Sequence, residues 1–222
     1  LDHESVEMVP AEPKLSLGQR LKRPWKDSLE LMRSRPEFSS FQWGFMACGF
    51  GIMLIQPVLP LFAVDELGIS NVEMAAAISV ARGLGFVVSS PLWGRWIEEV
   101  PLLRLTSFVF LGFGLFPLLL SLAPSSLVWL YVAYFWYGIA QGGSHLVWNM
   151  SGPIFAGKEG SARYTGVNVV MAGLRGGVAP PLGGVLGSVW GSVEVLIAGA
   201  LLCVTSGLYM LKSRFVEKKN FS

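Results

Sequence analysis

Six long apolar stretches dominate the sequence, and each is near the length of about 20 residues that an α-helix needs to cross a bilayer. They cover residues 39–63, 72–94, 102–122, 126–149, 165–188 and 193–211. Only 14% of the 222 residues are charged, whereas about 25% are charged in an average soluble domain. So few charges cannot cover the surface of a water-soluble fold. The composition therefore excludes a soluble enzyme and a nucleic-acid-binding protein and predicts an all-α membrane protein.

The connections between the six stretches are short, so that neighbouring helices must run antiparallel. We expect a six-helix transmembrane bundle over residues 39–211. A polar arm over residues 1–38 precedes it, and a short basic tail over residues 212–222 follows it. The protein therefore divides into an arm, a membrane bundle and a tail.

The arm contains a segment with apolar residues at helical spacing among basic side chains. The apolar positions are Leu21, Trp25, Leu29 and Met32. Pro24 suits a first-turn position and Pro36 a stop. The pattern is typical of an amphipathic helix lying on an anionic membrane surface, and an ordinary surface helix is the alternative.

Basic residues are confined to one set of connections. If the arm is cytoplasmic, the cytoplasmic side holds fifteen Lys and Arg and the opposite side holds none. Cytoplasmic connections of membrane proteins carry such an excess of positive charge. We therefore predict a multi-pass protein of the cell membrane, surrounded by lipid, with both termini in the cytoplasm.

Two arginines, Arg82 and Arg175, lie near the middle of the second and fifth stretches. A charge at that depth costs several kcal/mol unless it has a partner or a wet cavity. None of the stretches has Asp or Glu in its middle. Three partners remain: a carboxylate outside this chain, backbone carbonyls freed by Pro or Gly, or a bound anion. A structural clamp between helices competes with a role in substrate binding.

The two arginines lie in similar local sequences. Arg82 precedes a Pro-Leu-Trp-Gly segment at 91–94, and Arg175 precedes a Pro-Leu-Gly-Gly segment at 181–184. An inverted repeat of three plus three helices would place such segments around a twofold axis in the membrane plane. The two arginines would then occupy related positions near the centre, and chance similarity is the alternative.

Further polar residues lie inside the apolar stretches. Gln141, His145 and Asn149 are spaced to form one stripe of a helix, whereas Gln56 lies in the first stretch and Asn168 in the fifth. Such a stripe faces either a cavity or a hydrogen-bonding neighbour. His145 can carry a proton near neutral pH or serve as a structural hydrogen-bonding residue.

Prolines predict breaks in several of these helices, because each removes a backbone donor and frees a carbonyl. They are Pro57 and Pro60 in the first stretch, Pro117 in the third, and Pro180 and Pro181 in the fifth. The sequence has no spacing of residues typical of a metal site, a cofactor or a catalytic nucleophile.

Three segments of the chain resemble motifs of the major facilitator superfamily. PLWGRWIEEVPLLRL resembles its loop between the second and third helices, with Gly94 and Glu98 matching and Arg95 between them. The basic residue, Gly and second basic residue that usually follow are absent. QPVLPLFAVDELGIS resembles the first helix of a half. APPLGG resembles the fifth-helix motif of proton-coupled antiporters, with Pro180, Gly183 and Gly184 matching.

The resemblance implies a transporter that exposes a central site to each side of the membrane in turn. KRPWKDSLELMRSRPEF resembles the linker between the two six-helix halves of the family, which favours a C-terminal half. The missing half would then lie in the same chain or in a separate one. Gln56, Gln141, His145 and Asn149 would lie near the substrate, because the first and fourth helices line the site in this family. Arg82 and Arg175 would form an anion site or a clamp between the halves.

The sequence leaves the substrate open. The antiporter-like motif and the apolar helices favour proton-coupled efflux of drug-like or amphipathic solutes. The two arginines favour uptake or exchange of an organic or phosphorylated anion. A membrane scaffold that transports nothing is the third reading, and a membrane enzyme is disfavoured because no catalytic constellation is present.

Overall fold

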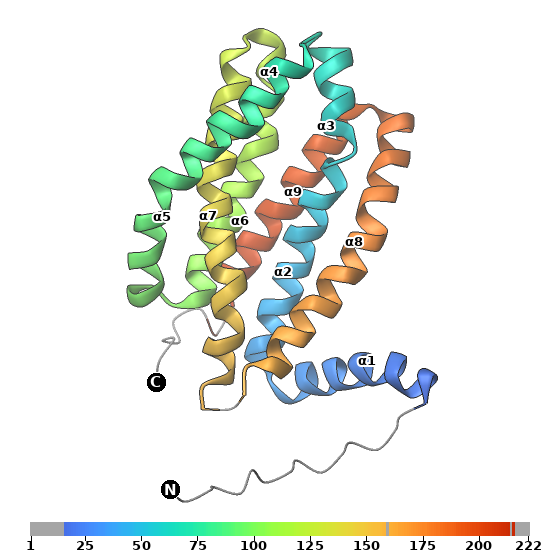
Figure 1. Ribbon diagram of the computed structural model, residues 1–222, viewed down its shortest axis with the longest axis vertical. Helices are drawn as coiled ribbons and strands as arrows, with labels where there is room; N and C mark the ends of the chain where they lie inside the picture. The colour runs from blue at the N-terminus through green and yellow to red at the C-terminus, as the bar shows by residue number, and fades with distance from the viewer. Residues whose placement is uncertain (1–15, 159, 214, 216–222) are drawn as a thin grey trace, which may run out of the picture.

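The computed structural model of the protein describes residues 16–158, 160–213 and 215, and no strand occurs among them. Figure 1 shows long helices standing side by side and one helix lying across an end of the bundle. The α-helices are α1 (Leu17–Ser34), α2 (Pro36–Ile55), α3 (Val58–Leu61), α4 (Asn71–Ala76), α5 (Arg82–Glu99), α6 (Leu102–Leu120), α7 (Val128–Ala156), α8 (Ala162–Trp190) and α9 (Ser192–Leu211). Three shorter turns are the π-helical η1 (Phe62–Glu66) and η2 (Ala77–Ala81) and the 3₁₀-helical η3 (Ala123–Ser125).

Five helical segments are long and apolar enough to cross a membrane, among the residues that the structure describes. They are Pro36–Glu66, Asn71–Glu99, Leu102–Ser125, Ala162–Trp190 and Ser192–Leu211. The remaining expected span, 126–149, falls on α7, which has 29 residues but is not among the five. Several Trp and Tyr residues, together with the polar stripe of Gln141, His145 and Asn149, lower the mean hydropathy of α7. Since α7 packs along α5 and α6, it runs between the same two ends of the bundle.

The long helices form pairs within the bundle. α6 packs against α9 and lies behind α7 in Figure 1, while α5 packs against α7 and α8 packs against α2. In the apolar window of the span that contains α6, 61% of the residues are buried, against 22% in those of α5 and α8. α6 is therefore central, whereas α5 and α8 expose most of their surface to what surrounds the bundle.

Apolar side chains gather in two clusters toward the two ends of the bundle. One includes Phe38, Phe41 and Tyr164, near the end where α1 lies. The rings of Phe38 and Tyr164 meet edge to face with centroids 5.0 Å apart, an arrangement that aromatic pairs favour. The other cluster, toward the opposite end, includes Leu54 and Phe116. The middle of the bundle lies between these two packed regions.

Helix α1 starts earlier than the sequence suggested. Since α1 begins at Leu17, Pro24 lies inside the helix. The expectation that Pro24 occupies the first turn is therefore wrong. A proline at that position removes one backbone hydrogen bond but leaves the following turns intact. The expected stop is correct, since α1 ends at Ser34 and Pro36 is the first residue of α2.

The side chains of α1 divide between two faces. Leu31 and Met32 are buried against the bundle, whereas Trp25 and Leu29 are 45% and 52% exposed. The predicted stripe is therefore split, with only Met32 of its described members buried. The side chain of Leu21, residues 1–15 of the arm and residues 216–222 of the tail lie outside the described part of the chain.

Proline breaks only one of the three helices in which we expected an interruption. The first span leaves α2 after Ile55, turns at Gln56 and Pro57, and continues as α3 and η1. In contrast, α6 passes through Pro117 and α8 passes through Pro180 and Pro181 without a break. Burial of Pro117 in α6, and of Ala179 next to the proline pair of α8, holds these segments in the bundle.

Two π-helical turns, η1 and η2, were not expected from the sequence. Such turns insert an extra residue into a helix and often occur at functional sites. The second turn, Ala77–Ala81, directly precedes Arg82 and so sets the direction in which α5 begins.

Candidate solute-binding cavity

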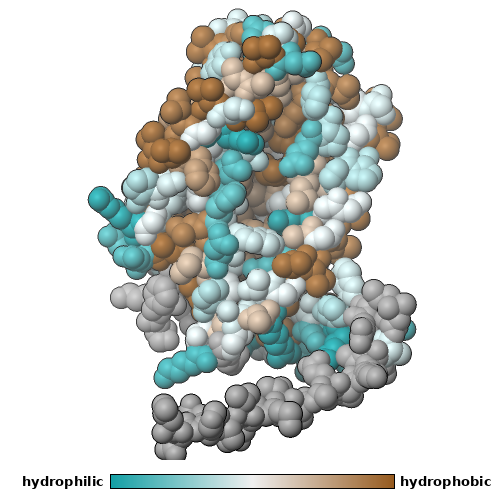
Figure 2. Space-filling model, viewed as in Figure 1, coloured by the Kyte–Doolittle hydropathy of each residue, from teal (hydrophilic) through white to brown (hydrophobic). Residues whose placement is uncertain are grey.

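An open cavity of about 200 Å³ lies in the middle of the bundle and is lined by residues of α2, α6, α7 and α8. Its lining residues are Phe45, Cys48, Gly49, Ile52, Met53, Gln56, Phe110, Phe113, Tyr137, Gln141, Ser144, His145 and Arg175. Figures 1 and 2 look at the bundle from the side of α2, α7 and α8. Figure 2 shows pale and teal residues running down the middle of this face, between browner, more hydrophobic flanks.

Arg175 brings a positive charge into this cavity. Its side chain is 8% exposed, and its Nη1 donates a hydrogen bond of 2.7 Å to the backbone oxygen of Phe45 on α2. The guanidinium carbon lies 4.7 Å from the centre of the Phe45 ring, within the range of a cation–π contact. The backbone carbonyl is thus the partner that the structure provides, out of the three that the sequence left open.

The guanidinium keeps hydrogen-bonding capacity after these contacts. Arginine has five N–H donors, and the buried Nε of Arg175 has no hydrogen-bond partner among the described residues. Leaving a neutral buried donor without a partner costs roughly 1–3 kcal/mol, and leaving a charged donor without one costs more. An acceptor that enters the cavity can satisfy this donor.

Gly49 provides the space that the guanidinium occupies. A Cβ atom added at position 49 would lie only 2.7 Å from Nε of Arg175, which is closer than such atoms approach one another. Any side chain at this position must therefore displace the guanidinium from its contact with Phe45. The spacing between α2 and α8 and the position of the charge depend on the same glycine.

The rest of the lining is aromatic and apolar, with few polar groups. No Asp or Glu occurs among the lining residues that the structure describes. Phe45, Phe110, Phe113 and Tyr137 supply ring surface, and the rings of Phe113 and Tyr137 are 5.4 Å apart. The cavity therefore combines one cationic group with an aromatic wall and suits a small solute that has an apolar body and an anionic group.

Three of the polar residues singled out in the sequence join Arg175 in this cavity. Gln141 and His145 reach it from α7, and Gln56 reaches it from the turn that ends α2. The imidazole of His145 stands edge to face against the ring of Phe86, with centroids 5.5 Å apart. Of the polar stripe on α7, Gln141 and His145 thus line the cavity.

Asn149 and Arg82 do not line the cavity. Asn149 is exposed and donates a hydrogen bond of 2.8 Å to the backbone oxygen of His145, within its own helix. Arg82 is half-buried at the start of α5, outside the lining of the cavity. The two arginines therefore have different surroundings, and they do not meet in one site.

The sequence did not predict a buried polar network that joins α2, α7 and α8. Gln42 of α2 donates to the side-chain oxygen of Asn168 on α8, which in turn donates a hydrogen bond of 2.9 Å to Ser151 on α7. All three side chains are buried. The sequence marked Asn168 as a polar residue at depth, but no spacing rule links positions on three different helices.

The segment expected to be a gating loop is helical. Gly94, Arg95 and Glu98 lie within α5, which continues to Glu99 before Pro101 precedes α6. Trp93 and Ile97 are buried on the same helix and hold its last turns against the bundle. No ion pair joins Arg95 and Glu98 in the part of the chain that the structure describes.

The three residues of the fifth-helix motif lie on α8 with different surroundings. Gly183 is buried where α8 crosses α2, and a Cβ atom there would collide with the backbone carbonyl of Leu54. For Gly184 the nearest atom to an added Cβ is the Cβ of Pro57, 3.9 Å away, which is an ordinary contact. Pro180 is half-buried.

Comparison with known proteins gives one family. The family described as Major Facilitator Superfamily matches residues 12–221 of the chain. No curated protein and no solved structure matches the chain.

Proposed function

Because the chain belongs to the major facilitator superfamily, we propose that it moves a small amphipathic organic anion across the membrane by alternating access. It is a multi-pass membrane protein of a transporter family, and its bundle is surrounded by lipid. In the proposal, the anionic group of the solute binds Arg175 and its apolar body lies against the aromatic wall of the cavity.

Arg175 is the observation that carries this proposal. It is the cationic side chain of the cavity, it is buried, and it retains an unsatisfied donor. No carboxylate balances it among the lining residues described above. A cavity with this charge repels organic cations and favours anions, so the anionic alternative suits the geometry better than export of cationic drugs does.

A second six-helix half is part of the proposal. The cavity of about 200 Å³ is smaller than the roughly 300–1,000 Å³ of pockets that enclose drug-sized ligands. A partner half placed against the face of Figure 1 would complete it. We propose that this half lies elsewhere in the same protein or in a separate chain and that the described bundle acts as the C-terminal half.

The packing of the helices supports an inverted repeat of three plus three helices. If α2, α5 and α6 correspond to α7, α8 and α9, the contact of α2 with α8 maps onto that of α7 with α5. The contact of α2 with α9 likewise maps onto that of α7 with α6. This pairing is what a twofold axis in the membrane plane produces.

Export coupled to protons is the second candidate, and His145 is the observation that favours it. This residue lines the cavity beside Gln141, and histidine is the side-chain type that most readily changes charge near neutral pH. Arg175, Tyr137 and Cys48 are the other ionisable groups of the lining. Export of an amphipathic anion in exchange for protons would then depend on His145 and lose its pH dependence in His145→Gln.

Three solutes that share one benzene ring test the proposed selectivity. Binding of benzoate, benzyl alcohol and benzylamine to the purified protein is measured by isothermal titration calorimetry. We expect benzoate to bind and benzylamine not to bind. Arg175→Gln should weaken benzoate binding by about tenfold or more, because it removes a charge-assisted hydrogen bond. Arg175→Lys, which retains the charge, should keep part of the affinity.

Correct insertion of each variant is checked by its melting temperature and by gel filtration. Benzylamine binding as strong as that of benzoate, or benzoate affinity unchanged in a folded Arg175→Gln protein, would refute the anion site. Failure of all three solutes to bind when the partner half is also present would refute the solute cavity and favour the membrane scaffold.

A further inference from the structure

A groove runs between α1 and the first turns of α8, apart from the cavity in the middle of the bundle. Its volume is about 550 Å³. From α1 it is lined by Arg23, Pro24, Asp27 and Ser28, and from α8 by Ala162, Arg163, Thr165, Gly166, Val167, Val169 and Val170. Figure 1 shows α1 crossing beneath the beginning of α8 at the end of the bundle. The groove therefore lies at the level where a membrane-spanning bundle meets the lipid headgroups.

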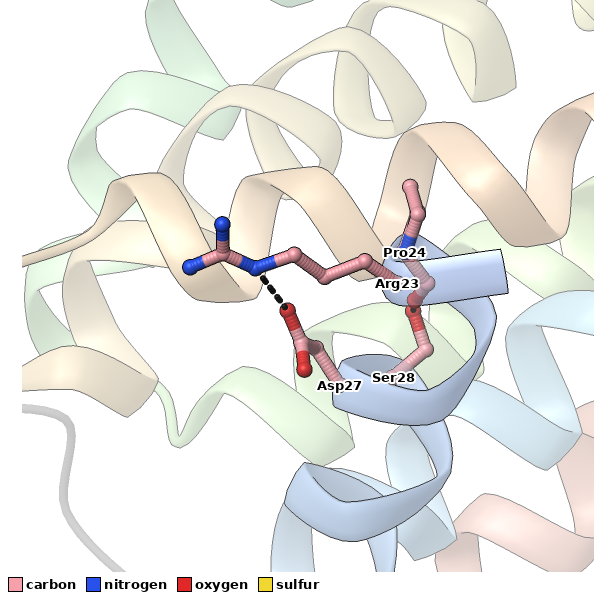
Figure 3. A network of polar contacts seen from close by, with 4 residues as sticks. All are labelled: Arg23, Pro24, Asp27 and Ser28. Carbon is pink, nitrogen blue, oxygen red and sulfur yellow. Dashed lines mark hydrogen bonds and ion pairs between the residues drawn. The ribbon is translucent and has the colours of Figure 1, made fainter. Parts of the chain in front are cut away.

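Two arginines from different helices face this groove. Arg163 is exposed in the first turn of α8 and has no ion-pair partner among the described residues. Arg23 forms a loose ion pair through its Nε, 3.7 Å from the carboxylate of Asp27. Figure 3 shows the two terminal nitrogens of Arg23 directed away from that carboxylate. A forked pair of donors on Arg23 therefore remains available to an oxyanion.

The backbone of α1 is fixed at this point by a local hydrogen bond. Ser28 is 4% exposed, and its hydroxyl donates a hydrogen bond of 2.6 Å to the backbone oxygen of Pro24 (Figure 3). The hydroxyl of Ser28 is thus satisfied internally and does not compete for a ligand. The polar groups left for recognition in the groove are chiefly the two guanidinium groups.

Apolar surface continues from the groove toward the bilayer. Val169 is 57% exposed in the lining of the groove on α8, whereas Trp25 and Leu29, 45% and 52% exposed, lie outside that lining on the other face of α1. An aromatic side chain such as Trp25 is favoured at the level of the headgroups. The site thus offers positive charge at the membrane surface and apolar side chains next to it, which is the complement of a phospholipid with an anionic headgroup.

We propose that the groove between α1 and α8 binds one anionic phospholipid, with its phosphate between Arg23 and Arg163. The acyl chains then lie along the valines of α8. Such a lipid fastens α1 to α8 at the base of the bundle, and the lipid composition of the membrane thereby controls how firmly the two helices are joined. This site is independent of the solute cavity, so the failure of one proposal leaves the other in place.

Native mass spectrometry of the full-length protein tests the site with phosphatidylglycerol and with phosphatidylcholine of the same acyl chains. The double variant Arg23→Gln/Arg163→Gln should lower the affinity for phosphatidylglycerol by about tenfold or more, because two charge-assisted contacts are lost. The matched double variant Lys22→Gln/Arg33→Gln removes the same charge from α1 outside the groove. It should change the affinity by less than about twofold.

A third variant tests the role of the ion pair. Asp27→Asn removes the carboxylate that competes for Arg23 and should strengthen binding of phosphatidylglycerol severalfold. Equal losses in the two double variants would show only a general attraction of the basic surface and would overturn the proposal. Equal binding of phosphatidylcholine, or displacement of the lipid by millimolar inorganic phosphate, would also overturn it, the latter in favour of a site for soluble phosphate.

Discussion

Arg175 illustrates what can and cannot be predicted at the scale of a single residue. Its depth and the lack of carboxylates in the apolar stretches are visible in the sequence, and they mark it as a group that needs a partner. That the partner is the backbone oxygen of Phe45, and that Gly49 provides the space, depends on how α8 packs against α2. Arg82 looks equivalent in the sequence, yet it lies outside the cavity because α5 packs mainly against α7.

Gly49→Ala is predicted to disable the proposed anion site without touching its charge. The added methyl group would lie 2.7 Å from Nε of Arg175, so the guanidinium must leave its position against Phe45. We expect benzoate affinity to fall by about tenfold, since correct placement of a charge-assisted donor is lost. Titration calorimetry on the purified variant measures this loss.

Gly177→Ala is the matched control, because this glycine on α8 has no atom within 4 Å of an added Cβ. It should bind benzoate like the unmodified protein. Equal affinities in the two alanine variants would show that the position of the guanidinium does not matter for binding.

At the scale of helices, the pattern of apolar residues was a good guide to where each helix lies and a poor guide to its breaks. The turn at Gln56 and Pro57 follows from the sequence, whereas the unbroken course of α8 through Pro180 and Pro181 does not. Packing of Ala179 and Gly183 on either side of this pair stabilises the helix, and such packing cannot be read from proline positions. The network joining Gln42, Asn168 and Ser151 escaped prediction for the same reason.

Asn168→Ala is predicted to destabilise the bundle, because it leaves the amide of Gln42 and the hydroxyl of Ser151 without their shared partner. The free energy of unfolding should fall by about 1–3 kcal/mol, the usual result of leaving buried polar groups unsatisfied. Equilibrium unfolding in mixed detergent micelles, followed by circular dichroism, measures the change.

Asn149, an asparagine on α7, supplies the comparison. Asn149 is exposed and bonds only to the backbone of its own helix, so Asn149→Ala should change the free energy of unfolding by less than about 0.5 kcal/mol. If both variants are equally stable, the buried network does not join the three helices.

At the scale of the whole molecule, a cavity with a buried charge lies where two packed apolar clusters meet. The number of long helices, the short connections and the gathering of basic residues in one set of connections are all visible in the sequence. The ends of the helices that carry those residues lie at the same end of the bundle as α1 (Figure 1). The cavity itself could not be predicted, since it depends on which faces of α2, α6, α7 and α8 meet.

Access to the cavity from both sides of the membrane is the central claim, and Gln141 is the position that reports on it. This residue is half-buried and lines the cavity from the middle of α7. A protein with Gln141→Cys, in which Cys48 and Cys203 are replaced by Ser, is produced in cells together with whatever partner half it assembles with. Sealed vesicles of either orientation are then treated with a membrane-impermeant thiosulfonate.

The measured quantity is the rate at which this cysteine is modified from each face of the membrane. Alternating access predicts modification from both faces, with both rates lowered by benzoate when it occupies the site beside Arg175. Modification from one face only, or rates that benzoate leaves unchanged from either face, would contradict transport of an anion through this cavity.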